Sequence, residues 1–203
     1  MSTAPHTTPD PAGLTWDVAT LFPRQGQWSD SDFLNLTEDL TRLVELTDGQ
    51  LKVLEMPTTS HQQIVFRLVC RLSDFVAPLE LGIALMAPLR IRLRPGMFRE
   101  PDVVFALKEH SQLVQEEFWT GADLVMEVVS SGAKSRRRDL DEKRREYATA
   151  GIQEYWIVDP LVETISVLAL VGSDYQVSGE FRKNDIARSH LLSGFTVAVS
   201  EIF

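Results

Sequence analysis

Two carboxylates stand in segments whose other residues are mostly apolar. Glu127 lies within residues 124–129, a run typical of strands that are covered on both faces. Asp102 stands at the start of a second apolar run, directly after Pro101. An ionised carboxylate that is buried without a partner costs several kcal/mol. Each of these two residues is therefore expected to have a cation or a proton beside it.

A lysine further along the chain completes this set. Residues 135–150 have a charged, helical pattern, and Gly151 is expected to end the helix. Leu140, Lys143 and Tyr147 have the i, i+3, i+7 spacing that places residues on one helical face. Because Leu140 and Tyr147 are the core contacts of this helix, we expect Lys143 to point with them towards the sheet.

Two carboxylates and a lysine are the parts of a metal-dependent hydrolytic site. Carboxylate oxygens suit Mg²⁺, and Mn²⁺ can substitute for it. Such an ion lowers the pKa of a bound water and neutralises charge on a scissile phosphate, while a lysine can orient that water and stabilise the developing negative charge. We therefore predict Asp102 and Glu127 as metal ligands, and Asp102, Glu127 and Lys143 as the catalytic residues.

Structural roles are open for several charged residues. Asp102 could cap a turn after the proline, and the amine of Lys143 could extend past the helix edge into water. Glu45 could be an additional acidic residue of the site, but its pattern fits simple solvent exposure equally well. Asp123 fits a strand cap, and His61 fits a residue of a first helical turn.

The sequence predicts both helices and strands around these residues. A short helix is expected from Ser29, and a β-hairpin is expected over residues 43–54, because Asp48-Gly49 favours a tight turn. Ser60 followed by Gln63 predicts a capping box at the start of an amphipathic helix. Strands are then expected over residues 82–87, 89–93, 101–106, 123–129, 154–158, 163–171, 175–177 and 195–199.

Length and composition limit the class of protein. The chain of 203 residues has room for one mixed α/β domain, which we place at residues 15–203 after a flexible tail over residues 1–14. Its single cysteine excludes disulfides within the chain and multi-cysteine zinc sites. There is no apolar run of about 20 residues and no signal-peptide pattern, so we expect a cytoplasmic protein without a membrane segment.

Charge leaves the choice of partner open. The formal net charge of −9 argues against indiscriminate coating of nucleic acid, although a local basic face remains compatible with it. The run of basic residues over 134–138 is one such candidate. Acidic residues are interleaved with the basic residues after this run. The run could therefore form a salt-bridged helix face, or it could contact the phosphates of a nucleic acid.

The order of motifs resembles that of the Uma2 family. The resemblance covers about residue 28 to the end of the chain. It is carried by residues 44–49, 60–61, 99–106, 123–130, 138–143, 147–160 and 201–203. The family is similar to the PD-(D/E)XK nuclease superfamily, which implies a restriction endonuclease-like mixed sheet flanked by helices, here with an N-terminal hairpin.

The resemblance also implies residue roles. Asp102 takes the place of the PD aspartate, and Glu127 takes that of the second acidic residue. Val129 occupies the usual position of the ExK lysine, and Lys143 on the following helix is the candidate replacement. The implied activity is Mg²⁺-dependent hydrolysis of phosphodiester bonds in DNA, and a homodimer would allow two strands to be cut.

Two hypotheses from different classes follow. The first is an endonuclease with Asp102, Glu127 and Lys143 at its active site. The second is a non-catalytic module of the same fold that binds nucleic acid or mediates oligomerisation, which the valine at position 129 and the acidic net charge favour. A glycosidase with two carboxylates is a third, weaker interpretation, because a lysine between the carboxylates is not typical of that chemistry.

Overall fold

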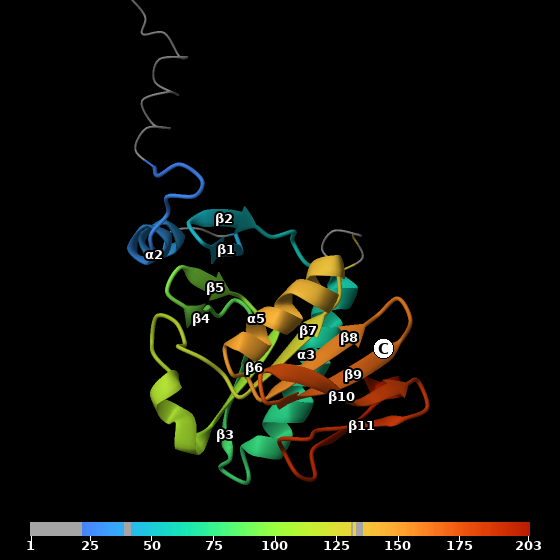
Figure 1. Cartoon of the computed structure of the whole chain (residues 1–203). Coiled ribbons are helices and arrows are strands. Elements are labelled where there is room, and N and C mark those ends of the chain that lie inside the picture. The colour runs from blue at the N-terminus through green and yellow to red at the C-terminus, as the bar shows by residue number, and fades with distance from the viewer. Residues whose placement is uncertain (1–21, 39–41, 131, 133–135) are drawn as a thin grey trace, which may run out of the picture.

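A computed structural model describes residues 22–38, 42–130, 132 and 136–203 (Figure 1). The tail predicted over residues 1–14 lies outside these ranges. A mixed sheet of six strands is flanked by helices, which confirms the predicted fold class. Its strands, in spatial order, are β10 (Asp174–Arg182), β9 (Thr164–Val171), β8 (Glu154–Asp159), β7 (Leu124–Val128), β6 (Val103–Leu107) and β3 (Gly82–Met86). Neighbours in this sheet are antiparallel except β7 and β8, which run parallel.

A second sheet lies at the N-terminal end of the molecule. It has the order β2 (Gln50–Val53), β1 (Val44–Thr47), β5 (Met97–Arg99), β4 (Ile91–Arg94), and α2 (Asp30–Glu38) packs on it. The ring centroids of Phe33 in α2 and Phe98 in β5 are 4.9 Å apart. The hairpin and the first helix were predicted, but β5 was not. The sequence carries little signal for so short a strand, because its pairing depends on partners that are distant in sequence.

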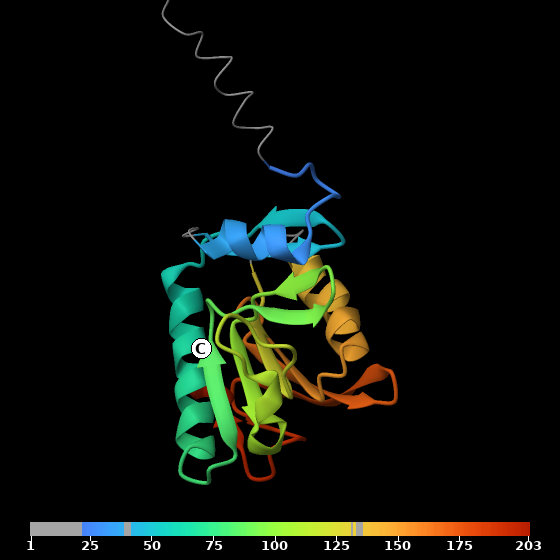
Figure 2. The ribbon, with the colours of Figure 1, turned by 90° about the vertical axis from the view of Figure 1, so that its left-hand side faces the viewer.

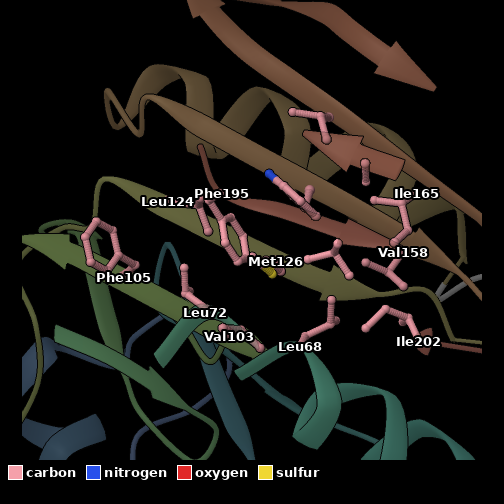
Figure 3. Close-up of a cluster of buried hydrophobic side chains, with 14 of the residues drawn as sticks. Leu68, Leu72, Val103, Phe105, Leu124, Met126, Val158, Ile165, Phe195 and Ile202 are labelled. Atoms are coloured by element: carbon pink, nitrogen blue, oxygen red, sulfur yellow. The ribbon is translucent and has the colours of Figure 1, made fainter. Parts of the chain in front are cut away.

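The helix α3 (Thr59–Val76) covers one face of the six-stranded sheet, as Figure 2 shows. Its cap is Thr58, whose hydroxyl accepts a hydrogen bond from the His61 amide, and not Ser60 as predicted. The predicted apolar stripe of this helix, including Leu68 and Leu72, packs on inward side chains of the strands (Figure 3). Residues from β11 (Ile186–Arg188), β12 (Thr196–Ala198) and η3 (Val199–Glu201) complete this core.

The opposite face is covered by α5 (Lys143–Thr149) (Figure 2). A π-helical turn, η2 (Arg138–Glu142), precedes α5, so the continuous α-helix expected over residues 135–150 is wrong for this part. Val104 and Val125 face α5, whereas Val103 and Met126 face α3, as the alternation of a strand requires. The remaining element is the 3₁₀ segment η1 (Lys108–Leu113). None of the helices in the described ranges is long and apolar enough to cross a membrane.

The hairpin turn of the second sheet provides a test of the fold. Gly49 has φ +76°, and a Cβ there would lie 2.6 Å from the backbone of Gly26. Gly172 also has a positive φ, +65°, but nothing lies near its Cβ position. We expect Gly172→Ala to lower the free energy of unfolding by about 1 kcal/mol, and Gly49→Ala to lower it by at least about twice as much. Equal losses in urea unfolding would contradict the packing of this turn on Gly26.

Candidate active site

Glu127 is buried in β7 on the face that α5 covers. Its Oε1 lies 2.7 Å from Nζ of Lys143 and accepts a hydrogen bond of 2.5 Å from the Tyr147 hydroxyl. Only 3% of the residue is exposed. The sequence-based expectation that this carboxylate has a cation beside it is therefore confirmed.

Lys143 is the first residue of α5 and is buried against the sheet. Its side chain is 5% exposed, so the alternative in which the amine extends into water is wrong. Nζ also lies 3.4 Å from Oδ1 of Asp139, one π-helical turn earlier. Leu140 and Tyr147 pack in the same cluster, as the helical spacing predicted. The ammonium thus lies between two carboxylates.

Asp102 directly precedes β6 and faces Glu127 across the sheet. The antiparallel register pairs Val103 with Met126, and one step further it places Asp102 opposite Glu127. Oδ2 of Asp102 accepts a hydrogen bond of 2.7 Å from the Val128 amide, and Oδ1 lies 2.9 Å from Nε2 of His61. These contacts join β6 to β7 and α3. The carboxylate is therefore not serving as a cap for the turn that contains it.

Sequence reasoning missed two side chains that lie at the site. His61 was interpreted as a residue of a first helical turn, yet its ring contacts Asp102. Asp139 was assigned to a salt-bridged face, yet it is buried and its Oδ2 accepts a hydrogen bond from the Ser130 amide. The spacing of Asp139 and Lys143, four residues apart on a helix, was a signal that could have indicated their contact.

Glu45 belongs to a second ion-paired layer next to the site. It is 1% exposed, so the solvent-exposed interpretation is wrong. Its Oε2 pairs with Arg138 and lies 4.0 Å from Nε of Arg99, which also forms a 2.6 Å ion pair with Glu146. The side chain of Glu45 thus connects β1 to the π-helical turn, and a role as a metal ligand stays a prediction.

Two arginines of the basic run over 134–138 make internal contacts, whereas Arg137 is exposed. Lys134 lies outside the described residues. Arg136 pairs with Asp159, Arg138 pairs with Glu45, and Arg144 donates to the Tyr175 carbonyl. These contacts favour the interpretation of the run as a salt-bridged helix face over one in which it contacts the phosphates of a nucleic acid.

The charges at the centre of the site leave an excess of negative charge. Asp102, Glu127 and Asp139 supply three carboxylates, and Lys143 is the ammonium that contacts two of them. Burial raises the pKa of Glu127 to about 7 although Lys143 acts to lower it. Burial also acts to lower the pKa of Lys143, but the carboxylates of Glu127 and Asp139 raise it above its ordinary value. Lys143 is thus protonated at neutral pH.

This donor set fits a hard divalent cation. With all three carboxylates ionised the centre carries two unbalanced negative charges, which one divalent ion would neutralise. No three His, Cys, Asp or Glu side chains of the described ranges are already grouped to hold an ion. Mg²⁺ commonly binds through one or two carboxylates and completes its shell with waters and substrate phosphates. Asp102 and Glu127 are the residues here that would hold it.

Comparison with known proteins identifies the family. The model of the Uma2 family, described as "Putative restriction endonuclease", matches residues 30–200. The chain belongs to the Uma2 family. A search of curated proteins gave no match. A crystal structure described as "a putative nuclease belonging to DUF820" from Anabaena variabilis has the same fold, with a TM-score of 0.65. It is 18% identical, and the similarity covers 84% of this chain and 96% of that one.

The Uma2 chain has a valine where the superfamily pattern has its lysine. Val129 is 4% exposed and packs in the cluster beneath α5, with Tyr147. Glu127 and Lys143 meet over this same face. Lys143 on the crossing helix therefore supplies a positive charge on the face of the sheet where Val129 also packs, and its catalytic role stays a prediction.

The coupling of Lys143 to Glu127 can be measured by a double-mutant cycle. Lys143→Met should lower the free energy of unfolding by about 3 kcal/mol, because it leaves a buried carboxylate without its cation. In a Glu127→Gln background the same substitution should cost less than half as much. Urea unfolding at pH 7 provides the comparison. Equal losses in the two backgrounds would mean that the ammonium and this carboxylate do not interact.

The buried carboxyl of Glu100 should make the stability of the fold depend on pH. Its Oε2 is buried without a hydrogen-bond partner, and burial, with the nearby charge of Glu45, raises its pKa from about 4.5 to about 7. The folded state therefore holds this proton more tightly than the unfolded state does. The stability that the protonated Glu100 carboxyl contributes to the fold is fully present below pH 4.5 and is lost as pH rises through 7.

Glu100→Gln should remove that loss. We expect the variant to gain stability over the wild type by about 2 kcal/mol more at pH 8 than at pH 4.5, measured by thermal unfolding at both values. A difference between variant and wild type that does not change with pH would show that the side chain is not protonated on folding.

Proposed function

We propose that this Uma2 protein is a divalent-metal-dependent DNA endonuclease that hydrolyses phosphodiester bonds, with Asp102 and Glu127 as metal ligands. The observation that carries the proposal is the pair of carboxylates formed by Asp102, just before β6, and Glu127 on β7, which an extension of the strand register by one residue places opposite each other. Nζ of Lys143 lies 2.7 Å from Glu127. Family membership and the fold shared with a protein described as a nuclease support it. We further propose Mg²⁺ as the ion, with Mn²⁺ able to substitute, and a cytoplasmic homodimer that cuts both strands.

Lys143 acts in this proposal as a fixed positive charge. Its pKa lies above the ordinary value, so the amine is a hydrogen-bond donor at neutral pH and not a general base. An ammonium in this place can orient a water and stabilise negative charge on a phosphate in the transition state. A bound divalent ion would supply further neutralisation of the phosphate and a more acidic water.

Neighbouring hydrogen-bond donors hold the two carboxylates in position. The Tyr147 hydroxyl donates a hydrogen bond to Glu127, and the Val128 backbone amide donates one to Asp102. Each carboxylate keeps one orientation because a protein donor occupies one of its oxygens. Rigid placement of this kind is what hydrolysis needs, since misplacement by about 1 Å can reduce a rate by roughly 100-fold.

A plasmid-cleavage assay with Mg²⁺ or Mn²⁺ tests the proposal. The wild type should cut DNA, and Asp102→Asn, Glu127→Gln and Lys143→Met should each lower the rate by about 100-fold or more, because each change removes a charge from the reacting centre. Asp123→Asn is the matched control. Asp123 directly precedes β7 as Asp102 precedes β6, but it binds the Leu107 amide at the opposite end of the strands.

The alternative module would give a different result. A folded wild type that binds no divalent ion and cuts no DNA would end the enzyme proposal. Metal-independent, salt-sensitive DNA binding that Glu127→Gln leaves unchanged would then support a non-catalytic nucleic-acid-binding protein. Self-association measured by sedimentation, without DNA binding, would support an oligomeric interaction module.

A further inference from the structure

The imidazole of His61 lies against the exposed side of the candidate metal site. His61 is in the first turn of α3, where the hydroxyl of Thr58 holds its amide at 3.2 Å. The ring reaches across to Asp102, with Nε2 2.9 Å from Oδ1. Helix capping therefore accounts for the backbone of His61 but not for the direction of its side chain.

The two facing atoms have the separation of neighbouring ligands on one ion. Metal–nitrogen and metal–oxygen bonds of about 2.1 Å at right angles place adjacent ligand atoms about 3 Å apart. Nε2 of His61 and Oδ1 of Asp102 are 2.9 Å apart. Oδ2 of Asp102 is already held by the Val128 amide, so Oδ1 is the oxygen left to face an ion together with the ring.

The side of the site that His61 and Asp102 form is also the one more accessible to solvent. The side chains of His61 and Asp102 are 18% and 17% exposed, whereas those of Glu127 and Lys143 are 4% and 5% exposed. An ion or a phosphate arriving from solvent therefore meets the imidazole and the aspartate first. The carboxylate of Asp102 contacts the ring directly.

We infer that His61 is a third metal ligand, which gives the site a mixed nitrogen and oxygen donor set that prefers Mn²⁺-type transition ions to Mg²⁺. This inference rests on the proposed function, because it uses the same ion site. To bind an ion the ring would have to be neutral, with Nε2 facing the ion and the proton on Nδ1. Imidazole suits transition ions, whereas Mg²⁺ favours oxygen ligands and retains its waters. Mg²⁺ can still support the reaction, but it binds more weakly than Mn²⁺.

Another histidine–aspartate pair in the chain shows the purely structural arrangement. Nδ1 of His110 lies 2.7 Å from Oδ1 of Asp123. Asp123 also accepts hydrogen bonds from the Leu107 amide and from Nε2 of Gln153. Both of its oxygens are thus occupied by protein donors, at the end of β7 away from Glu127. His110 is therefore the matched control for His61.

Electron paramagnetic resonance of added Mn²⁺ tests the inference without any activity measurement. The wild-type protein should bind Mn²⁺, and its electron spin-echo modulation should contain the ¹⁴N coupling of a directly bound imidazole. His61→Gln should abolish that coupling and weaken Mn²⁺ binding by at least about 10-fold. The preference for Mn²⁺ over Mg²⁺, measured by competition, should fall with it, whereas His110→Gln should leave all three unchanged.

The outcomes separate this inference from the proposed function. If Mn²⁺ binds to the wild type but shows no ¹⁴N coupling, His61 only positions Asp102, and the inference is wrong while the nuclease proposal stands. The same holds if His61→Gln retains the coupling. If the folded wild type binds no Mn²⁺, both proposals are overturned.

Discussion

The buried contact between Lys143 and Glu127 is the interaction on which the rest of the site depends. A carboxylate in the middle of a covered sheet requires compensation, and this ammonium supplies it at 2.7 Å. Asp139 and Tyr147 then contact the same two groups, so four side chains from β7, η2 and α5 hold one another in place. The π-helical turn is part of this arrangement, because it contains Asp139, four residues before Lys143. Such turns often occur at functional sites.

A second layer of charge connects the N-terminal sheet to this centre. Glu45 on β1 pairs with Arg138 in the π-helical turn, and Arg99 on β5 pairs with Glu146 on α5. The second sheet thus contacts η2 through one ion pair and α5, which carries Lys143, through another, and both pairs are mostly removed from water. Buried pairs specify geometry more reliably than they add stability. We therefore interpret this layer as one that fixes where η2 and α5 begin.

The parts of the site that sequence could predict are those encoded within one element. Glu127 interrupts an apolar strand, and Lys143 shares a helical face with Tyr147, so each carried a local signal. His61 carried only its place in the family motif over residues 60–61, because its partner Asp102 is 41 residues away. Asp139 also carried a local signal, because its i, i+4 spacing to Lys143 favours a contact between the two side chains. For the fold, the hairpin and most strands of the larger sheet followed from apolar patterns, whereas β5 and β11 are three-residue strands that depend on distant partners. The treatment of residues 15–203 as one domain stays a prediction.

Among the described strands of the six-stranded sheet, β7 and β8 alone run in the same direction. Parallel neighbours cannot be joined by a tight hairpin, so the chain that leaves β7 just after Glu127 must return across a face of the sheet. It returns over the face on which Glu127 lies. A positive side chain on the inner side of that return is therefore near the carboxylate whether it originates in the strand or in the helix. The parallel pair of strands thus lets the helix that returns over Glu127 carry its countercharge, as Lys143 does.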